Sequence, residues 1–140
     1  MKKTGWIKLV LCSALLLGCS ATSSIHQAIR TYHQQEEKVA LGQSKTEVLA
    51  VLQPTQDVLP PKQSKPREIY REGETLKEIY FFRSRSFDDG LVTDDEFTPY
   101  VFSDGVLVAI GWSAIGGPKT QAQTRRHDNY CYYHDSRMHY

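Results

Sequence analysis

The segment from Tyr100 to Trp112 constrains the fold of this chain more than any other part of its sequence. Apolar and β-branched residues stand on both sides of the dipeptide Asp104-Gly105. Asp and Gly adopt the positive φ angles of a tight primed turn, and the twist of such a turn matches the twist of paired strands. We therefore predict an antiparallel β-hairpin here, with its turn at this dipeptide.

Two further strands are predicted before the hairpin. Residues 68–71 form a short candidate strand, and the Glu-Gly-Glu sequence at 72–74 a turn. Residues 76–84 form a longer strand, in which Ile79, Phe81 and Arg83 fall on one face and Tyr80 and Phe82 on the other. The acidic segment 88–96 interrupts the β pattern, so we predict a loop there.

Helical signals occupy the part of the chain before these strands. Apolar residues recur at spacings near three and four over residues 25–39, which predicts an amphipathic helix. The sequence from Ser44 to Glu47 is typical of a capping box and predicts the start of a second helix. The predicted buried face of that helix is Val48, Leu49 and Leu52. Pro54 ends it, because proline cannot continue the hydrogen-bond ladder.

The order of these elements indicates the fold class. A Pro-containing loop over 53–65 separates the helices from the strands, and Gly116-Gly117-Pro118 ends the predicted folded region. We predict an α+β two-layer sandwich over residues 25–117. In it, two N-terminal helices pack on a three- to four-stranded antiparallel meander, because that arrangement buries the apolar faces of both layers.

The N-terminus carries an export signal. Lysines at positions 2, 3 and 8 precede an apolar run over 9–17, which is shorter than the roughly 20 residues that span a bilayer. The sequence Leu16-Leu17-Gly18-Cys19 matches the bacterial lipobox, in which the cysteine is acylated and becomes the first residue. We predict a lipoprotein signal peptide at 1–18 and a lipidated, small and polar tether at 19–24. The alternatives are a cleaved secretory signal and an uncleaved membrane anchor.

Lipidation of Cys19 implies a location. Acyl chains such as palmitate contribute about 0.8 kcal/mol per buried methylene, so more than one chain anchors a protein stably in a membrane. Resemblance to bacterial lipoproteins also implies that Ser20, directly after the cysteine, is compatible with sorting to the outer membrane. We expect an anchored protein on the periplasmic face of the outer membrane.

The net charge argues against nucleic-acid binding, and the cysteine content argues against an internal disulfide. Without residues 1–18, which hold three lysines and no acidic residue, the chain has 14 basic and 16 acidic residues and a net charge of −2. This balance gives no basic surface for nucleic acid. Cys12 leaves with the signal and Cys19 takes the lipid, so Cys131 is the only free thiol predicted and no internal disulfide can form.

Residues 118–140 are predicted to form a flexible tail that is rich in His and Tyr. His127, Cys131, His134 and His139 have the side-chain types that bind zinc or copper, which makes a metal-binding envelope lipoprotein the alternative function. The other interpretation is an exposed tail whose Tyr and His side chains cover the sheet or remain mobile. No standard zinc-finger spacing is present in this tail.

We expect a binding protein and no enzyme. No serine or cysteine stands in a recognisable nucleophile motif with a positioned base, and no glycine-rich phosphate loop occurs. Aromatic residues alternate along the predicted strands, so both faces of the sheet carry them. Phe81, Phe102 and Trp112 are predicted to lie in the core. Tyr80, Phe82 and Tyr100 are the predicted partner-binding patch, because Tyr is common where proteins meet.

Two sequence stretches carry a resemblance to a known family. Residues 41–49 match a G-x-[ST]-x-x-x-V helix start, and residues 95–107 read Asp-Glu-Phe-Thr-Pro-Tyr-Val-Phe-Ser-Asp-Gly-Val-Leu. Together with the lipobox, this arrangement over 39–112 resembles small bacterial envelope lipoproteins related to the SmpA/OmlA group. That group includes the small accessory subunit of the outer-membrane β-barrel assembly machine, and its fold is similar to a repeat of the β-lactamase-inhibitor protein.

The resemblance implies a function for the chain. It implies a lipid-anchored periplasmic binding or scaffold protein, accessory to outer-membrane assembly or maintenance, with an envelope protein as its partner. The chain departs from the subunit at Leu52-Gln53-Pro54, where a glycine usually precedes the proline, and in the acidic loop and His-rich tail. These departures favour a relative of the subunit.

Overall fold

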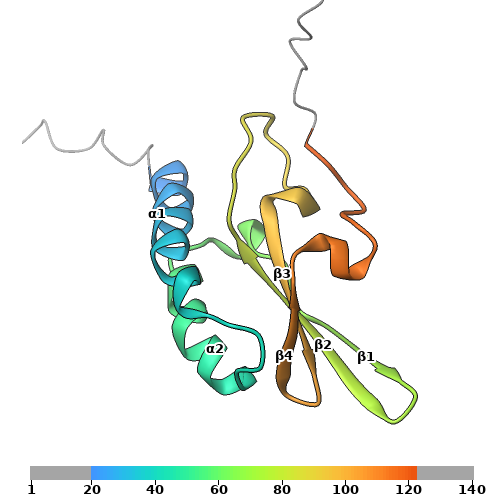
Figure 1. Cartoon of the computed structure of the whole chain (residues 1–140). Helices are drawn as coiled ribbons and strands as arrows, with labels where there is room; N and C mark the ends of the chain where they lie inside the picture. The colour runs from blue at the N-terminus through green and yellow to red at the C-terminus, as the bar shows by residue number, and fades with distance from the viewer. Residues whose placement is uncertain (1–19, 123–140) are drawn as a thin grey trace, which may run out of the picture.

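Two α-helices and a four-stranded antiparallel sheet make up the described part of the chain. The computed structural model describes residues 20–122. The elements are α1 (Ser20–Gln35), α2 (Lys45–Leu52), β1 (Glu68–Glu72), β2 (Thr75–Arg83), β3 (Phe97–Ser103) and β4 (Val106–Ile110). The strands follow the order β1-β2-β3-β4, and both helices lie along one face of the sheet (Figure 1). The predicted α+β architecture is confirmed, with helices packed on an antiparallel meander.

The hairpin between β3 and β4 has the predicted turn. Asp104 has a φ of 48° and Gly105 a φ of 81°, so both central residues adopt the positive φ of a primed turn. Ser103 and Val106 pair on either side of it. The register shifts between Val101 and Phe102, which leaves a β-bulge in this ladder.

The capping box predicted for α2 is also present. The backbone N–H of Glu47 donates to Ser44 Oγ at 3.3 Å, and the N–H of Ser44 donates to Glu47 Oε2 at 2.9 Å. These bonds satisfy backbone donors that a helix start leaves without a partner. α2 ends at Leu52, and Pro54 follows within a short 3-10 helix, as expected for a residue that lacks the N–H.

The core lies between the helices and the sheet. Its fully buried members are Tyr32 from α1, Val48 and Leu52 from α2, Phe82 from β2, Tyr100 and Phe102 from β3, and Leu107 from β4. The rings of Phe82 and Tyr100 meet edge to face at 5.2 Å between centroids, a favourable arrangement for aromatic pairs. This cluster joins both helices to the last three strands.

The predicted partner-binding patch is wrong for Phe82 and Tyr100. Their side chains are 2% and 1% exposed, because both point toward the helices. Tyr80 pairs directly with Tyr100, and Phe102 stands two residues further along β3, so all of them share the helix-facing side. The prediction grouped Phe102 with Phe81 as core, whereas the register sets these two residues on opposite faces. Alternation separates two sets of residues but does not show which set the helices cover.

The boundary predicted for the N-terminal tether is also wrong. α1 begins at Ser20, so residues 20–24 form its first turns, whereas the helix was predicted to begin at residue 25. Ala28 and Tyr32 of α1 are fully buried against the rest of the fold, which anchors the helix. Once a helix is nucleated, each added residue gains a hydrogen bond at little further cost, so a small polar segment extends it.

A pair of buried tyrosines links α1 to the sheet. The hydroxyl groups of Tyr32 and Tyr100 form a hydrogen bond of 2.9 Å in the core. Burial raises the pKa of Tyr32 far above its ordinary value, and the hydrogen bond with Tyr100 adds to that rise. Burial likewise raises the pKa of Tyr100, although the hydrogen bond with Tyr32 acts in the opposite direction. Both hydroxyls therefore stay neutral in the folded protein.

This pair predicts a loss of stability at alkaline pH. Because the pKa of each buried tyrosine is higher in the folded than in the unfolded chain, its contribution is complete below about pH 10 and is lost as the pH rises further. We expect the free energy of unfolding, measured in urea, to fall between about pH 9 and about pH 11. The double variant Tyr32→Phe, Tyr100→Phe should lack most of that fall. Tyr70→Phe, at an exposed tyrosine, should keep it. An equal fall in all three proteins would contradict this assignment.

Candidate functional site

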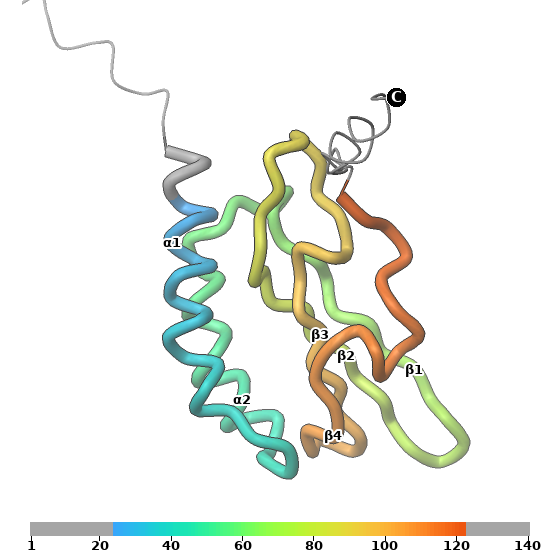
Figure 2. Tube along the Cα trace, turned by 45° about the horizontal axis from the view of Figure 1, so that its top comes forward, coloured from blue at the N-terminus to red at the C-terminus, as the bar shows by residue number. Residues whose placement is uncertain are grey.

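The C-terminal segment, residues 112–122, crosses the face of the sheet that is opposite the helices. We call this face the open face. After β4, a short 3-10 helix (Trp112–Ile115) turns the chain back over this face, and the segment then runs up toward the acidic loop, residues 88–96 (Figure 2). Trp112 Nε1 donates to the backbone oxygen of Phe97 at 2.7 Å. Its ring stacks on that of Phe81 with 5.6 Å between centroids. The open face is therefore partly covered by the chain itself.

The acidic loop holds the end of this segment. Asp94 Oδ2 accepts hydrogen bonds from the backbone N–H groups of Lys119 at 3.0 Å and Thr120 at 3.2 Å. Asp95 accepts another from the N–H of Ala122 at 3.0 Å. The flexible tail predicted from residue 118 is therefore wrong for residues 119–122, which are tied down by these bonds. Aspartates that lie far from the tail in sequence supply the partners, so local sequence does not reveal them.

Lys65 lies beside the contact between the acidic loop and the C-terminal segment, where it pairs with two carboxylates. Its Nζ lies 2.9 Å from Asp94 Oδ1, 3.9 Å from Glu68 Oε1, and 4.7 Å from the centroid of the Phe81 ring. Burial alone would raise the pKa of Asp94, but Lys65 and the two backbone donors outweigh it and hold the pKa below its ordinary value. Asp94 is thus ionised at neutral pH and fixes both the lysine and the C-terminal segment.

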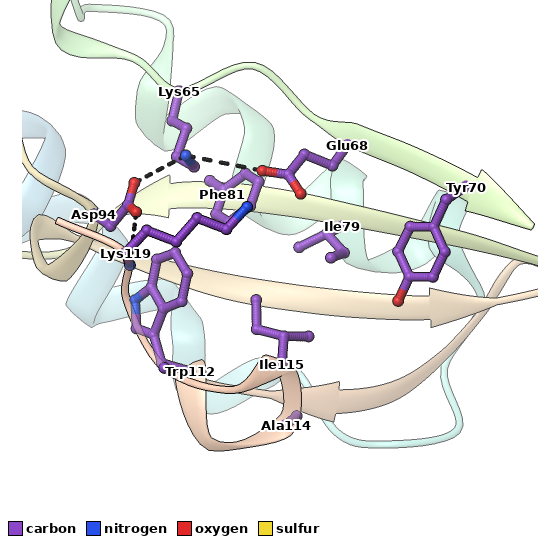
Figure 3. A pocket seen from close by; sticks show the side chains of 11 residues that line it. Lys65, Glu68, Tyr70, Ile79, Phe81, Asp94, Trp112, Ala114, Ile115 and Lys119 are labelled. Carbon is purple, nitrogen blue, oxygen red and sulfur yellow. Dashed lines mark hydrogen bonds and ion pairs between the residues drawn. The ribbon is translucent and has the colours of Figure 1, made fainter. Parts of the chain in front are cut away.

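A groove of about 240 Å³ lies on the open face between β1 and the C-terminal segment (Figure 3). Ile79 and Phe81 of β2 form its floor. One wall consists of Glu68 and Tyr70 from β1, and the other of Trp112, Ala114, Ile115 and Gly117 from the C-terminal segment. Lys65, Asp94 and Lys119 stand at its charged end. An apolar floor with a few placed charges is typical of a binding site.

A buried ion pair supports the end of the groove that the acidic loop forms. Arg83 Nη2 donates to Glu96 Oε1 at 2.7 Å, and the two side chains are 2% and 0% exposed. Arg83 Nη1 also donates to Gln63 Oε1 at 2.8 Å. Glu96 Oε1 and Oε2 accept from the backbone N–H groups of Phe87 and Thr93, each at 3.1 Å. The pair therefore fixes both ends of the acidic loop against β2.

The electrostatics of this pair depend on its partners. Burial lowers the pKa of Arg83, whereas the charge of Glu96 and its hydrogen bond act in the opposite direction. A buried charge is tolerated only when it is paired and hydrogen-bonded. Sequence reasoning did not identify this pair. Two features of the sequence could have indicated it. Arg83 falls on the same strand face as the apolar residues Ile79 and Phe81, and the carboxylate of Glu96 stands directly before β3.

Most of the residues predicted as sites lie beyond the described part of the chain. Cys19, His127, Cys131, His134 and His139 fall outside residues 20–122. Within that range, no three His, Cys, Asp or Glu side chains come together as a metal site, and no helix has the length and apolar character to cross a membrane. Tyr80 is half-buried, and its hydroxyl accepts a hydrogen bond from Arg67 Nη1 at 2.6 Å.

Comparison with known proteins finds no matching family, no similar curated protein and no similar solved structure. Function is therefore inferred from the geometry of the chain itself. The described feature best suited to hold another molecule is the groove, because its apolar floor and charged end are fixed by contacts from four separate segments.

Breaking the ion pair should destabilise the whole domain. Glu96→Gln leaves the buried Arg83 guanidinium without a counter-charge, so we expect the free energy of unfolding to fall by about 3–5 kcal/mol. The control is Glu72→Gln, because Glu72 forms a surface ion pair at 3.6 Å from Lys77 and its side chain is 72% exposed. That control should leave stability nearly unchanged. Urea unfolding measures both variants, and similar small losses would show that Arg83 and Glu96 do not support the fold.

Proposed function

We propose that this chain is a lipid-anchored protein of the bacterial envelope that acts by binding another envelope protein in the groove on its open face. The role that fits best is that of an accessory or scaffold in outer-membrane assembly or maintenance. The single observation that carries the binding role is the groove, which places apolar side chains and charges together on the face that the helices leave uncovered.

The lipid anchor is supported by residues 1–19. A basic start, a short apolar run and the sequence Leu-Leu-Gly-Cys occur in the order that lipoprotein processing requires. The described domain starts directly after Cys19, with α1, so an acylated cysteine would leave the fold intact. The proposed location is the periplasmic face of the outer membrane, in keeping with Ser20 at the position after the cysteine.

The binding role is supported by the composition of the groove. Aromatic and aliphatic side chains form its floor and walls. Two of them, Tyr70 and Trp112, are of the types enriched among the residues that supply most of the binding energy at protein contacts. Ala114 and Tyr70 on its walls are exposed, so a partner can reach them. The SmpA/OmlA-like helix start and hairpin are in keeping with the same role, because that group works by association with envelope proteins.

Substitution of Cys19 tests the anchor. Cys19→Ser removes the thiol to which the acyl chains attach, so we expect radiolabelled palmitate incorporation to disappear. The protein should then move from the membrane fraction to the soluble periplasmic fraction. Cys131→Ser is the matched control, since it removes a thiol outside the lipobox, and it should keep both the label and the membrane location. Unchanged fractionation of Cys19→Ser would exclude lipidation at this residue.

Filling the groove tests the binding role. Ala114→Trp places a large side chain on the groove wall, whereas Ser113→Trp adds the same side chain at an exposed neighbour that does not line the groove. After crosslinking in intact cells and mass spectrometry, we expect Ala114→Trp to lower the yield of the main crosslinked partner by at least about tenfold. Ser113→Trp should give the wild-type yield. If the two variants give equal yields, the groove is not the binding site.

A further inference from the structure

Among residues 20–122, no segment pairs with the outer edge of the sheet at β1. β1 is the edge strand, and all five of its residues are exposed. It lies on the side of the sheet away from the helices (Figure 1). An uncovered edge strand presents backbone N–H and C=O groups that can pair with another extended chain.

The chain itself covers the start of the other edge, at β4. The segment before α2 runs beside β4, where Gly42 N–H donates to the oxygen of Leu107 at 2.8 Å and Leu107 N–H donates to the oxygen of Gln43 at 2.9 Å. Lys45 N–H donates to the oxygen of Gly105 at 2.7 Å. Strand addition at β4 would have to displace these bonds. The two edges therefore differ, because the segment before α2 covers the start of β4 whereas all five residues of β1 are exposed.

The register identifies which groups of β1 point outward. Leu76 directs its backbone away from β1, because its N–H donates to Asp104 Oδ1 and its oxygen accepts from the N–H of Asp104, each at 2.9 Å. Its partner Arg71 therefore makes no ladder bonds with it. Bonded and non-bonded pairs alternate in an antiparallel ladder, so Ile69 is in the same position. The N–H and C=O groups of Ile69 and Arg71 face outward.

The side chains of β1 carry a charge pattern. Glu68, Tyr70 and Glu72 lie on the open face, and Ile69 and Arg71 on the other. A second copy of β1 in the fully overlapping antiparallel register would set Glu68 against Glu72 at both ends. Like charges directly opposite each other destabilise a strand pair, so this edge disfavours its own copy. A segment of complementary charge suits it.

We propose that β1 binds an extended segment of the partner protein as an antiparallel fifth strand. Basic residues of that segment lie opposite Glu68 and Glu72, an aromatic residue opposite Tyr70, an aliphatic one opposite Ile69, and an acidic one opposite Arg71. Glu68 and Tyr70 also form a wall of the groove, so the added strand extends the same site. This inference rests on the proposed function and specifies the form and chemistry of the partner.

A designed peptide tests the pairing directly. The probe is a short synthetic peptide with the core Lys-Glu-Phe-Val-Lys, and its control carries Glu in place of both Lys residues. When the probe is added to the purified protein, we expect amide hydrogen exchange at Ile69 and Arg71 to slow by at least about tenfold, because both N–H groups become bonded. The control peptide should bind at least about tenfold more weakly. Equal binding of the two peptides, or protection elsewhere alone, would overturn the proposal.

A proline substitution in β1 distinguishes binding through backbone pairing from binding through side-chain contacts. Ile69→Pro removes an outward N–H and leaves the ladder to β2 intact, a position where edge strands accept proline. Ile69→Val keeps that N–H and most of the side chain. We expect Ile69→Pro to abolish peptide binding while thermal unfolding shows a folded domain, and Ile69→Val to bind within about threefold of wild type. Wild-type affinity in a folded Ile69→Pro protein would overturn the proposal.

Two further outcomes would overturn it by assigning another occupant. Slow exchange at residues 69 and 71 before the peptide is added, increasing with protein concentration, would place a second copy on β1. Slow exchange that is independent of concentration would place the chain's own residues there. In cells, loss of the crosslinked partner in Ala114→Trp but not in Ile69→Pro would reject strand addition and keep the groove, whereas retention in Ala114→Trp would reject the proposed function itself.

Discussion

The buried ion pair between Arg83 and Glu96 is the interaction on which the open side of this protein depends. It joins the end of β2 to the start of β3, and Glu96 also binds the backbone on both sides of the acidic loop. Because the loop is held, Asp94 and Asp95 stand where they can bind the returning C-terminal segment. That segment forms a wall of the groove. Loss of one buried charge would therefore disturb the groove, although most of the residues that line it are far away in the sequence.

The two faces of the sheet are built by different forces. The helix-facing side holds the larger apolar cluster, and its stability comes mainly from burying rings such as Phe82 and Phe102. The open face has a smaller apolar cluster around Phe81 and is closed by ion pairs and backbone hydrogen bonds. Polar contacts of this kind hold a segment in place without filling the space beneath it. This difference explains how the chain keeps a groove on one side and a dense core on the other.

Local sequence patterns predicted the elements whose cause is local. The turn at Asp104 and Gly105 and the capping box at Ser44 need only neighbouring residues, so both are confirmed. The alternation along β2 and β3 separated two sets of side chains. It did not show that the helices cover the set that includes Tyr100, because that depends on where the helices pack. The groove was not predicted from the sequence. Its parts meet through pairings such as that of Asp94 with Lys119, which join segments that share no local pattern.

In the proposed lipid-anchored form, the start of α1 directly after Cys19 would limit how far the domain can stand from a membrane. An acyl group at that cysteine would be joined to a rigid rod of 16 residues, about 24 Å long, with no loose spacer between them. Rotation about a few bonds at the junction would be the main freedom left to the domain. Any protein that it binds would have to approach within a short distance of the lipid surface, which favours membrane-embedded neighbours over freely diffusing ones.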